Sequence, residues 1–181
     1  MVDVIRLIKE GKKVIAMVAP ATEGQFGPDI TMASWKIALK QIGFTDMVEV
    51  GLGGDMTAAY ESEEWAQAHR EGKKMTTSCC PAFVNMIKQH FPTLLENMST
   101  TVSPMCAVSR LIKAGDPEAV TVFIGPCIAK KSESLDHHIE GNACLLYTSD
   151  PRREKIRHTW QYFQQEKMTR RGDPPGKQRT R

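Results

Sequence analysis

The pattern of hydrophobic and polar residues divides the chain into alternating helix-like and strand-like segments. Unbroken apolar runs at Val14–Val18 and at residues 121–125 predict strands that are buried on both faces of a sheet. DMVEVGLGGD (residues 46–55) predicts another strand, and MTTS (residues 75–78) predicts a short one. Helical spacing predicts helices at residues 2–11, 30–42, 56–72, 81–91 and 104–115, with Asp55 capping the third. This alternation is typical of an α/β fold with a mostly parallel sheet flanked by helices.

Three of these segments lead into loops whose residues can carry chemistry. APATEG closes the first strand, TSCCP follows the short strand, and GPCIAKK begins where the strand at residues 121–125 ends. Ligands of open α/β sheets collect at the carboxyl ends of the strands, so we expect one site that draws on all three loops. The sequence contains no P-loop and no GxGxxG motif, and therefore has no nucleotide-binding fingerprint.

The composition is that of one globular domain. The chain has 181 residues, of which 41% are hydrophobic, and this is sufficient for a core of ordinary size. The apolar run Val14–Val18 is too short for a signal-peptide core or a membrane span, so we expect a cytoplasmic protein without a membrane partner. Five cysteines are an odd number for a disulfide framework, and favour metal or redox chemistry.

Positive charge is concentrated at the end of the chain. Residues 151–181 carry ten Lys and Arg against three acidic residues. The net charge of this segment is thus +7. Since the whole chain has a net charge of +3, residues 1–150 have a net charge of −4. A basic tail can bind nucleic acid, but this one lacks apolar periodicity, and we expect no nucleic-acid partner. We interpret residues 1–142 as the folded domain and residues 143–181 as a disordered or artefactual tail.

The cysteines next to prolines are the strongest candidates for chemistry. Cys80 and Cys127 each adjoin a proline at a predicted strand end, and their thiolates suit an iron-sulfur cluster or zinc. The alternative is that both are small buried core residues. Cys79 adjoins Cys80 on a backbone expected to be extended, so the two side chains point to opposite sides and have different roles. Lys130 and Lys131 either form a solvated pair or direct one cation toward an anionic cluster or ligand.

Three motifs resemble the catalytic domain of the iron-only hydrogenases. They are TSCCPAFVNMIKQHFP (residues 77–92), STTVSP (residues 99–104) and FIGPCIAKKSE (residues 123–133). The resemblance extends from about residue 14 to about residue 140. It implies a partial version of that family's two-lobed catalytic domain. It also implies an H-cluster, in which a 4Fe-4S cluster joins a diiron subcluster, and reversible reduction of protons to hydrogen with ferredoxin or another iron-sulfur electron carrier as partner.

The resemblance also implies roles for individual residues. Cys80 and Cys127 match ligands of the 4Fe-4S cluster, and Cys79 matches the thiol that passes protons to the diiron subcluster. Ser99 and Glu133 fall at positions of the family's proton path. Further contacts to the cofactor are implied for four residues: Pro20, Ala21, Ser103 and Lys130.

Several positions depart from the family pattern and indicate a divergent subgroup. Gly125 and Met105 stand where better-known members have methionine and glutamine, and Tyr60 precedes Glu61 where two adjacent acids are expected. The family's third motif, with two more cysteines among glycines, has no match, because Cys144 stands alone in NACLLYTSD. The chain therefore resembles the N-terminal part of the domain, truncated before that motif.

Two other functional interpretations remain open on the sequence. One is a non-enzymatic, hydrogenase-like iron-sulfur protein that serves cluster assembly or sensing. Relatives of the assembly type usually lack the adjacent cysteine pair, so Cys79 favours hydrogen chemistry. The other is an α/β domain whose cysteines are core residues.

Overall fold

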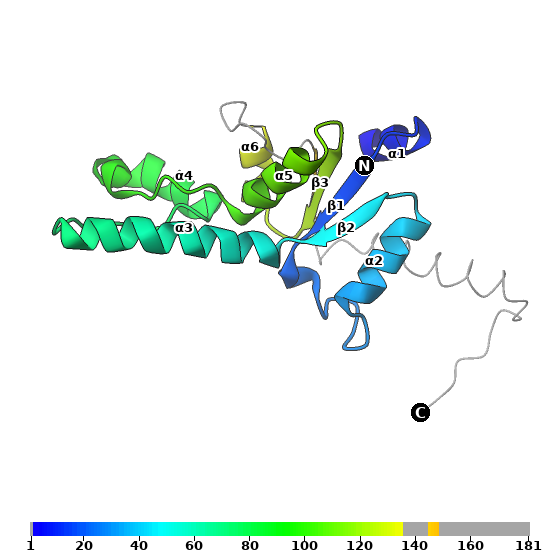
Figure 1. Ribbon diagram of the computed structural model, residues 1–181, viewed down its shortest axis with the longest axis horizontal. Helices are drawn as coiled ribbons and strands as arrows, with labels where there is room; N and C mark the ends of the chain where they lie inside the picture. Colours follow the sequence, from blue (N-terminus) through cyan, green and yellow to red (C-terminus); the bar gives the residue numbers. More distant parts are fainter. Residues whose placement is uncertain (1, 136–144, 149–181) are drawn as a thin grey trace, which may run out of the picture. The chain divides into compact units, whose positions relative to one another are not determined.

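The protein is built around a four-stranded parallel sheet, seen in a computed structural model that describes residues 2–135 and 145–148 (Figure 1). The strands lie in the order β2-β1-β3-β4, and every neighbouring pair is parallel. Their bounds are Val14–Val18 for β1, Asp46–Glu49 for β2, Val120–Gly125 for β3 and Leu145–Thr148 for β4. The predicted α/β class with a parallel sheet is confirmed.

Helices connect the strands and cover both faces of the sheet. Their bounds are Val2–Lys9 (α1), Met32–Gln41 (α2), Gly51–Arg70 (α3), Pro81–His90 (α4), Pro104–Gly115 (α5) and Ala129–Ser134 (α6). Two 3-10 helices, Pro20–Thr22 (η1) and Pro92–Asn97 (η2), lie between them. One compact unit comprises Met1–Thr148. It includes β4, which lies beyond the domain boundary expected at residue 142, whereas residues 149–181 of the expected tail lie outside the described residues.

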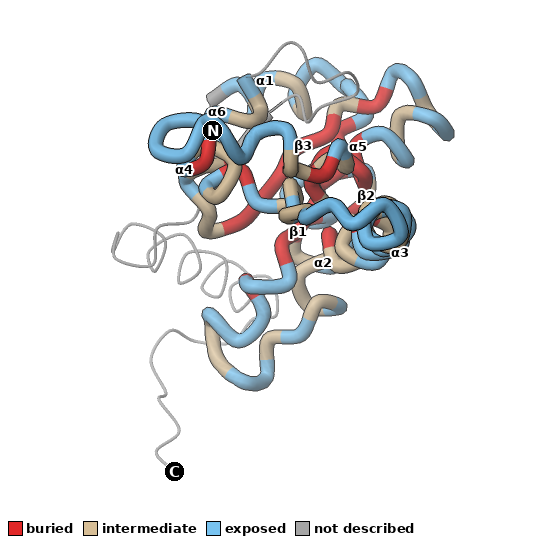
Figure 2. Tube along the Cα trace, turned by 90° about the vertical axis from the view of Figure 1, so that its left-hand side faces the viewer, coloured by how far each residue is buried: buried red, intermediate tan, exposed pale blue. Residues whose placement is uncertain are grey.

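The central strand β1 is apolar throughout because helices pack on both of its faces. Alternate side chains of a strand point to opposite faces. Val14, Ala16 and Val18 form one core cluster, which also contains Leu39 of α2. Met17 belongs to a second cluster, with buried residues of α5. Figure 2 shows the buried segments gathered in β1, β3 and α5.

The structure corrects two expected elements. Residues 51–55 were expected to continue a strand, but β2 ends at Glu49 and α3 begins at Gly51, so Asp55 lies inside the helix and does not cap it. The physical reason is the contact between α3 and α5, which uses Gly53 for close approach: a Cβ at this position would clash with the Pro104 carbonyl oxygen. Residues 75–78 form no strand; among them, only Thr76 makes an isolated bridge, to Met98.

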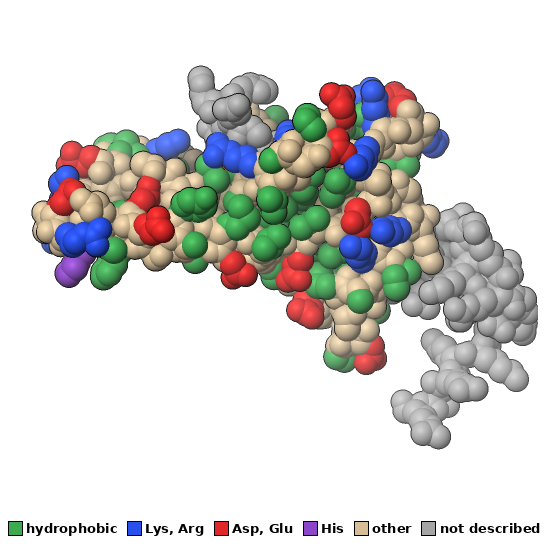
Figure 3. All heavy atoms as spheres, viewed as in Figure 1, with side chains coloured by type: hydrophobic (Ala, Val, Ile, Leu, Met, Phe, Trp, Pro, Cys, Tyr) green, Lys and Arg blue, Asp and Glu red, His purple; other side chains and the backbone are tan. Residues whose placement is uncertain are grey.

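The surface of the described residues keeps some large hydrophobic side chains. Figure 3 shows such side chains gathered around the region where α3 and α5 lie. Leu52 of α3 is 47% exposed and Leu111 of α5 is 46% exposed. No helix in the described part of the chain has both the length and the apolar character needed to cross a membrane.

Candidate functional site

Two of the predicted site segments lie at the same edge of the sheet. Pro20 and Ala21 follow β1 in η1, where both are exposed. Cys127 follows β3 and is half-buried, and the next element is α6, which carries Lys130 and Glu133. Because β1 and β3 are adjacent and parallel, these two segments begin at neighbouring carboxyl ends of the sheet.

The third segment reaches the site through α4. Cys80 occupies the N-cap position of α4 in an extended conformation, with φ −111° and ψ 110°, and its side chain is exposed. Cys79 is half-buried. Helix α4 contacts α6, where the Asn85 side-chain amide donates a hydrogen bond to Ser132 Oγ at 3.4 Å. The helix that begins after the cysteine pair is thereby joined to the helix that follows Cys127.

A carboxylate of α3 approaches Cys79 through a hydroxyl group. Glu61 accepts a hydrogen bond from Ser78 N at 2.9 Å, and its Oε1 lies 2.8 Å from Thr77 Oγ1. The same Thr77 hydroxyl lies 3.2 Å from Cys79 Sγ. Carboxylate, hydroxyl and thiol therefore form a continuous chain of groups that can each hold or pass a proton.

A second carboxylate, one turn later in α3, binds the segment that contains Ser99. Glu64 accepts hydrogen bonds from Ser99 Oγ, Thr100 N and Thr101 Oγ1. Burial acts to raise the pKa of Glu64, but these hydrogen bonds outweigh it and hold the pKa below its usual value. Ser99 itself is buried. Ser99, which was predicted for a proton path, thus donates a hydrogen bond to Glu64.

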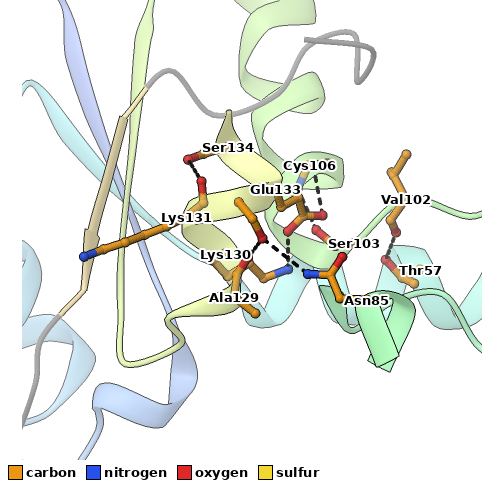
Figure 4. Close-up of polar contacts among 11 residues, drawn as sticks. Thr57, Asn85, Val102, Ser103, Cys106, Ala129, Lys130, Lys131, Glu133 and Ser134 are labelled. Atoms are coloured by element: carbon orange, nitrogen blue, oxygen red, sulfur yellow. Dashed lines mark hydrogen bonds and ion pairs between the residues drawn. The ribbon is translucent and has the colours of Figure 1, made fainter. Parts of the chain in front are cut away.

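Lys130 and Glu133 form an ion pair that is largely removed from water (Figure 4). Lys130 Nζ lies 2.8 Å from Glu133 Oε2, and the two side chains are 10% and 9% exposed. Lys131, the next residue, is exposed and points away from the pair. Of the two adjacent lysines, Lys130 is therefore the one that faces inward.

A buried thiol lies on the other side of the Glu133 carboxylate. Cys106 of α5 donates a hydrogen bond to Glu133 Oε1 at 3.6 Å. Burial, reinforced by the negative charge of Glu133, raises the pKa of the Cys106 thiol to about 12. Ser103 caps α5, and its Oγ accepts a hydrogen bond from Cys106 N at 3.4 Å. The cofactor contact that the resemblance implies for Ser103 stays a prediction; in the structure its side chain caps α5.

A cavity of about 450 Å³ is lined both by the segment that contains Ser99 and by Glu133. It lies between α4, α6 and the segment 98–103, and its walls include Ser99, Ser103, Asn85 and Glu133. Ser99 and Glu133, the two residues predicted for a proton path, therefore line the same cavity. Hydroxyl and amide groups make its wall suitable for ordered water.

The described residues supply only part of a ligand set for a cluster. They contain no group of three or more His, Cys, Asp or Glu side chains placed to hold a metal ion. Cys80 is exposed and Cys127 is half-buried, whereas Cys106 is buried and protonated. Cys144 lies outside the described residues. A 4Fe-4S cluster takes four ligands, so the described residues do not by themselves fit the complete H-cluster.

Sequence reasoning missed three residues that contact the predicted site. Glu61 was noted only as a departure from a family pattern, and Glu64 and Cys106 were not considered for the site. Glu61 and Glu64 are three residues apart, as are Lys130 and Glu133. This spacing places side chains on one helical face, and is the signal that could have identified the acidic pair. Cys106 has no comparable signal in the sequence.

Comparison with known proteins gives a consistent result. The model of the family "Iron only hydrogenase large subunit, C-terminal domain" matches residues 12–150. Iron hydrogenase 1 of Clostridium pasteurianum is 33% identical over 141 residues, which cover 68% of this chain and 24% of that protein. The cytosolic Fe-S cluster assembly factor NAR1 of Candida dubliniensis is 29% identical over 112 residues, covering 58% of this chain and 19% of NAR1.

The fold is shared with solved hydrogenase structures. The apo form of a variant of the FeFe-hydrogenase HydA1 from Chlamydomonas reinhardtii superposes with a TM-score of 0.62 at 22% identity. The match covers 90% of this chain and 44% of that one. The chain thus spans less than half the length of this structure, and about a quarter of the length of the Clostridium relative.

Proposed function

The chain belongs to the iron-only hydrogenase large-subunit family, and from this premise we propose that it forms part of a site that interconverts protons and hydrogen. The observation that carries the proposal is that the loops of Pro20 and Cys127 leave neighbouring carboxyl ends of the sheet. In addition, α4, which begins directly after Cys80, contacts α6, which carries Lys130. The electron partner that this function calls for is ferredoxin or another iron-sulfur carrier. We also propose a cytoplasmic location, where such cysteines stay reduced.

In this proposal Cys80 and Cys127 are metal ligands. Thiolates are the usual ligands of iron-sulfur clusters, and neither cysteine is fully buried. If further ligands completed it, an H-cluster held by these two cysteines would supply redox-active iron. Lys130 places a cation beside the loop of Cys127, where a positive charge lowers the cost of burying an anionic group. Pro20 and Ala21 are proposed as neighbours of the same group.

The side chains of α3 handle protons in this proposal. A protonated Glu61 gives its proton to Thr77 Oγ1, while the Thr77 hydroxyl passes its own proton to the Cys79 thiolate. The Thr77 Oγ1 atom lies 2.8 Å from Glu61 Oε1 and 3.2 Å from Cys79 Sγ, which is close enough for both transfers once the Thr77 hydroxyl turns toward the sulfur. Ser99 with Glu64, and Glu133 across the cavity, extend the set of groups that can exchange protons with water.

Iron and acid-labile sulfide, measured after anaerobic reconstitution of the 181-residue chain, test the proposed ligands. We expect binding below one cluster per chain, and we expect Cys80→Ser combined with Cys127→Ser to abolish it. Cys106→Ser is the matched control, because that thiol is buried and protonated and its loss should leave iron uptake unchanged. Iron and sulfide uptake that survives in the double variant, or that is absent from the unaltered chain, would contradict the proposal.

A second candidate is a non-enzymatic role in cluster assembly or sensing, favoured by the similarity to NAR1. The two functions differ in what they require of Cys79. In a chain that carries the whole family domain, Cys79→Ser should abolish hydrogen turnover and leave the iron content intact if the protein is an enzyme. An assembly or sensing protein would show no hydrogen turnover even before the substitution. Its iron content would also be the same with and without Cys79→Ser.

A further inference from the structure

Cys106 contacts the proposed site without being one of its ligands. It lies in the first turn of α5, three residues after the capping Ser103, and it is fully buried. Its pKa of about 12 means that the thiol keeps its proton at neutral pH. A protonated thiol is a hydrogen-bond donor, and the acceptor here is Glu133 Oε1 at 3.6 Å.

Glu133 is consequently held on both of its oxygen atoms. Oε1 accepts from Cys106, and Oε2 lies 2.8 Å from Lys130 Nζ. The three groups come from two helices, as Figure 4 shows, with Cys106 on α5 and the ion pair on α6. α6 has only six residues, so contacts with neighbouring elements matter more for the position of its side chains than its own helical bonds do.

We propose that Cys106 is a positioning residue, whose thiol fixes the Glu133 carboxylate and thereby the Lys130 ammonium group. A carboxylate with one oxygen held by a donor loses rotational freedom, and an ammonium paired with its other oxygen is restricted with it. Lys131 has the same chemistry one residue later but is exposed. The idea that Lys130 faces an anionic ligand rests on the proposed function. The idea that Cys106 holds Lys130 in place, through Glu133, does not depend on it.

Competitive acetylation of lysines in the intact 181-residue chain tests this proposal without any cofactor. The measured quantity is the acetylation rate of Lys130 divided by that of Lys131, obtained by peptide mass spectrometry. Lys131 thus serves as an internal standard on the same helix. We expect Lys130 to react much more slowly than Lys131 in the unaltered protein, because an ion-paired and buried amine is a poor nucleophile.

Three substitutions at Cys106 separate hydrogen bonding from packing. Cys106→Val removes the donor and adds about one methyl group of volume, and should raise the ratio roughly threefold to tenfold. Cys106→Ala should do the same, whereas Cys106→Ser retains a donor and should keep the ratio within about twofold of the unaltered protein. Should the alanine variant fail to fold, the valine and serine pair carries the comparison.

Val108→Ala is the matched control for general loosening of the core. Val108 is fully buried on the same helix, and its truncation should leave the ratio unchanged. An unchanged ratio in Cys106→Val would overturn the proposal, and so would an equal rise in Val108→Ala. Because the labelling is done on protein without a cluster, failure of the proposed hydrogenase function leaves its outcome unaffected.

Discussion

At the scale of single residues, one carboxylate can accept several hydrogen bonds from a distant segment of the chain. Glu64 is the clearest case, since it accepts from Ser99, Thr100 and Thr101 in a segment 35 or more residues away. Replacing the carboxylate by a neutral amide weakens all of these bonds, because hydrogen bonds to charged groups are stronger than those between neutral groups. We expect Glu64→Gln to lower the free energy of unfolding at pH 7 by about 2 kcal/mol, measured by urea denaturation.

The pH dependence of this loss follows from the lowered pKa of Glu64. The carboxyl is easier to ionise in the folded than in the unfolded protein, so its contribution is present above the ordinary pKa of 4.5 and is lost as the pH falls through the folded value. The difference between Glu64→Gln and the unaltered protein should therefore shrink in acid. Glu63→Gln, at an exposed neighbouring position, is the control; a loss as large as that of Glu64→Gln would contradict the assignment.

Asp46 provides a second pH-dependent contribution, away from the site. Burial acts to raise its pKa, but hydrogen bonds from Lys36 and Lys40 lower it from 3.8 to about 2. The stabilisation is thus present above pH 3.8 and is lost as the pH falls through about 2. Because the Asp46 side chain is 43% exposed, water screens the ion pairs, and Asp46→Asn should lower the free energy of unfolding at pH 7 by about 1 kcal/mol or less.

Added salt should reduce this loss of stability, as denaturation at low and high ionic strength would show. A loss that is independent of salt would argue against ion pairing.

At the scale of secondary-structure elements, the packing of α3 against α5 depends on Gly53. A Cβ at this position would clash with the Pro104 carbonyl oxygen and lie 2.8 Å from Val108 Cγ2. The backbone of one helix must then move away from the other, so we expect Gly53→Ala to destabilise the protein by about 2 kcal/mol. The neighbouring Gly54 has no atom within 4 Å of such a Cβ, and Gly54→Ala should stabilise α3 by about 0.5 to 1 kcal/mol. Thermal unfolding of both variants checks the prediction, and equal effects would contradict it.

These elements also show how far the sequence predicts the structure. β1 and β3 could be predicted because an unbroken apolar run is characteristic of a strand covered on both faces. The start of α3 could not, because GLGG has weak helix propensity, and the close approach to α5 that uses Gly53 is not visible in the sequence. The sequence motifs predict Cys79 and Lys130 as site residues, but no motif predicts Cys106. Its contact with Glu133 joins positions 27 residues apart, and arises only when α5 and α6 meet.

At the scale of the whole molecule, the described residues leave apolar side chains on the surface around α3 and α5 (Figure 3). Leu52 and Leu111 are each nearly half exposed. Exposed apolar surface binds hydrophobic dyes and contributes little to folding stability. We expect Leu52→Gln combined with Leu111→Gln to reduce binding of such a dye, and to change the free energy of unfolding by no more than about 0.5 kcal/mol.

A buried residue of α5, Val108, should respond in the opposite way to substitution. Val108 is fully buried beneath α3, and Val108→Ser removes a packed side chain and introduces a hydroxyl group into the core. It should lower the unfolding temperature and increase dye binding, because loss of core packing exposes further apolar surface. Fluorescence titration and thermal unfolding, done on the same samples, distinguish the two effects. A double leucine variant that unfolds as readily as Val108→Ser would show that this surface is part of the core, since only buried apolar side chains contribute stability on that scale.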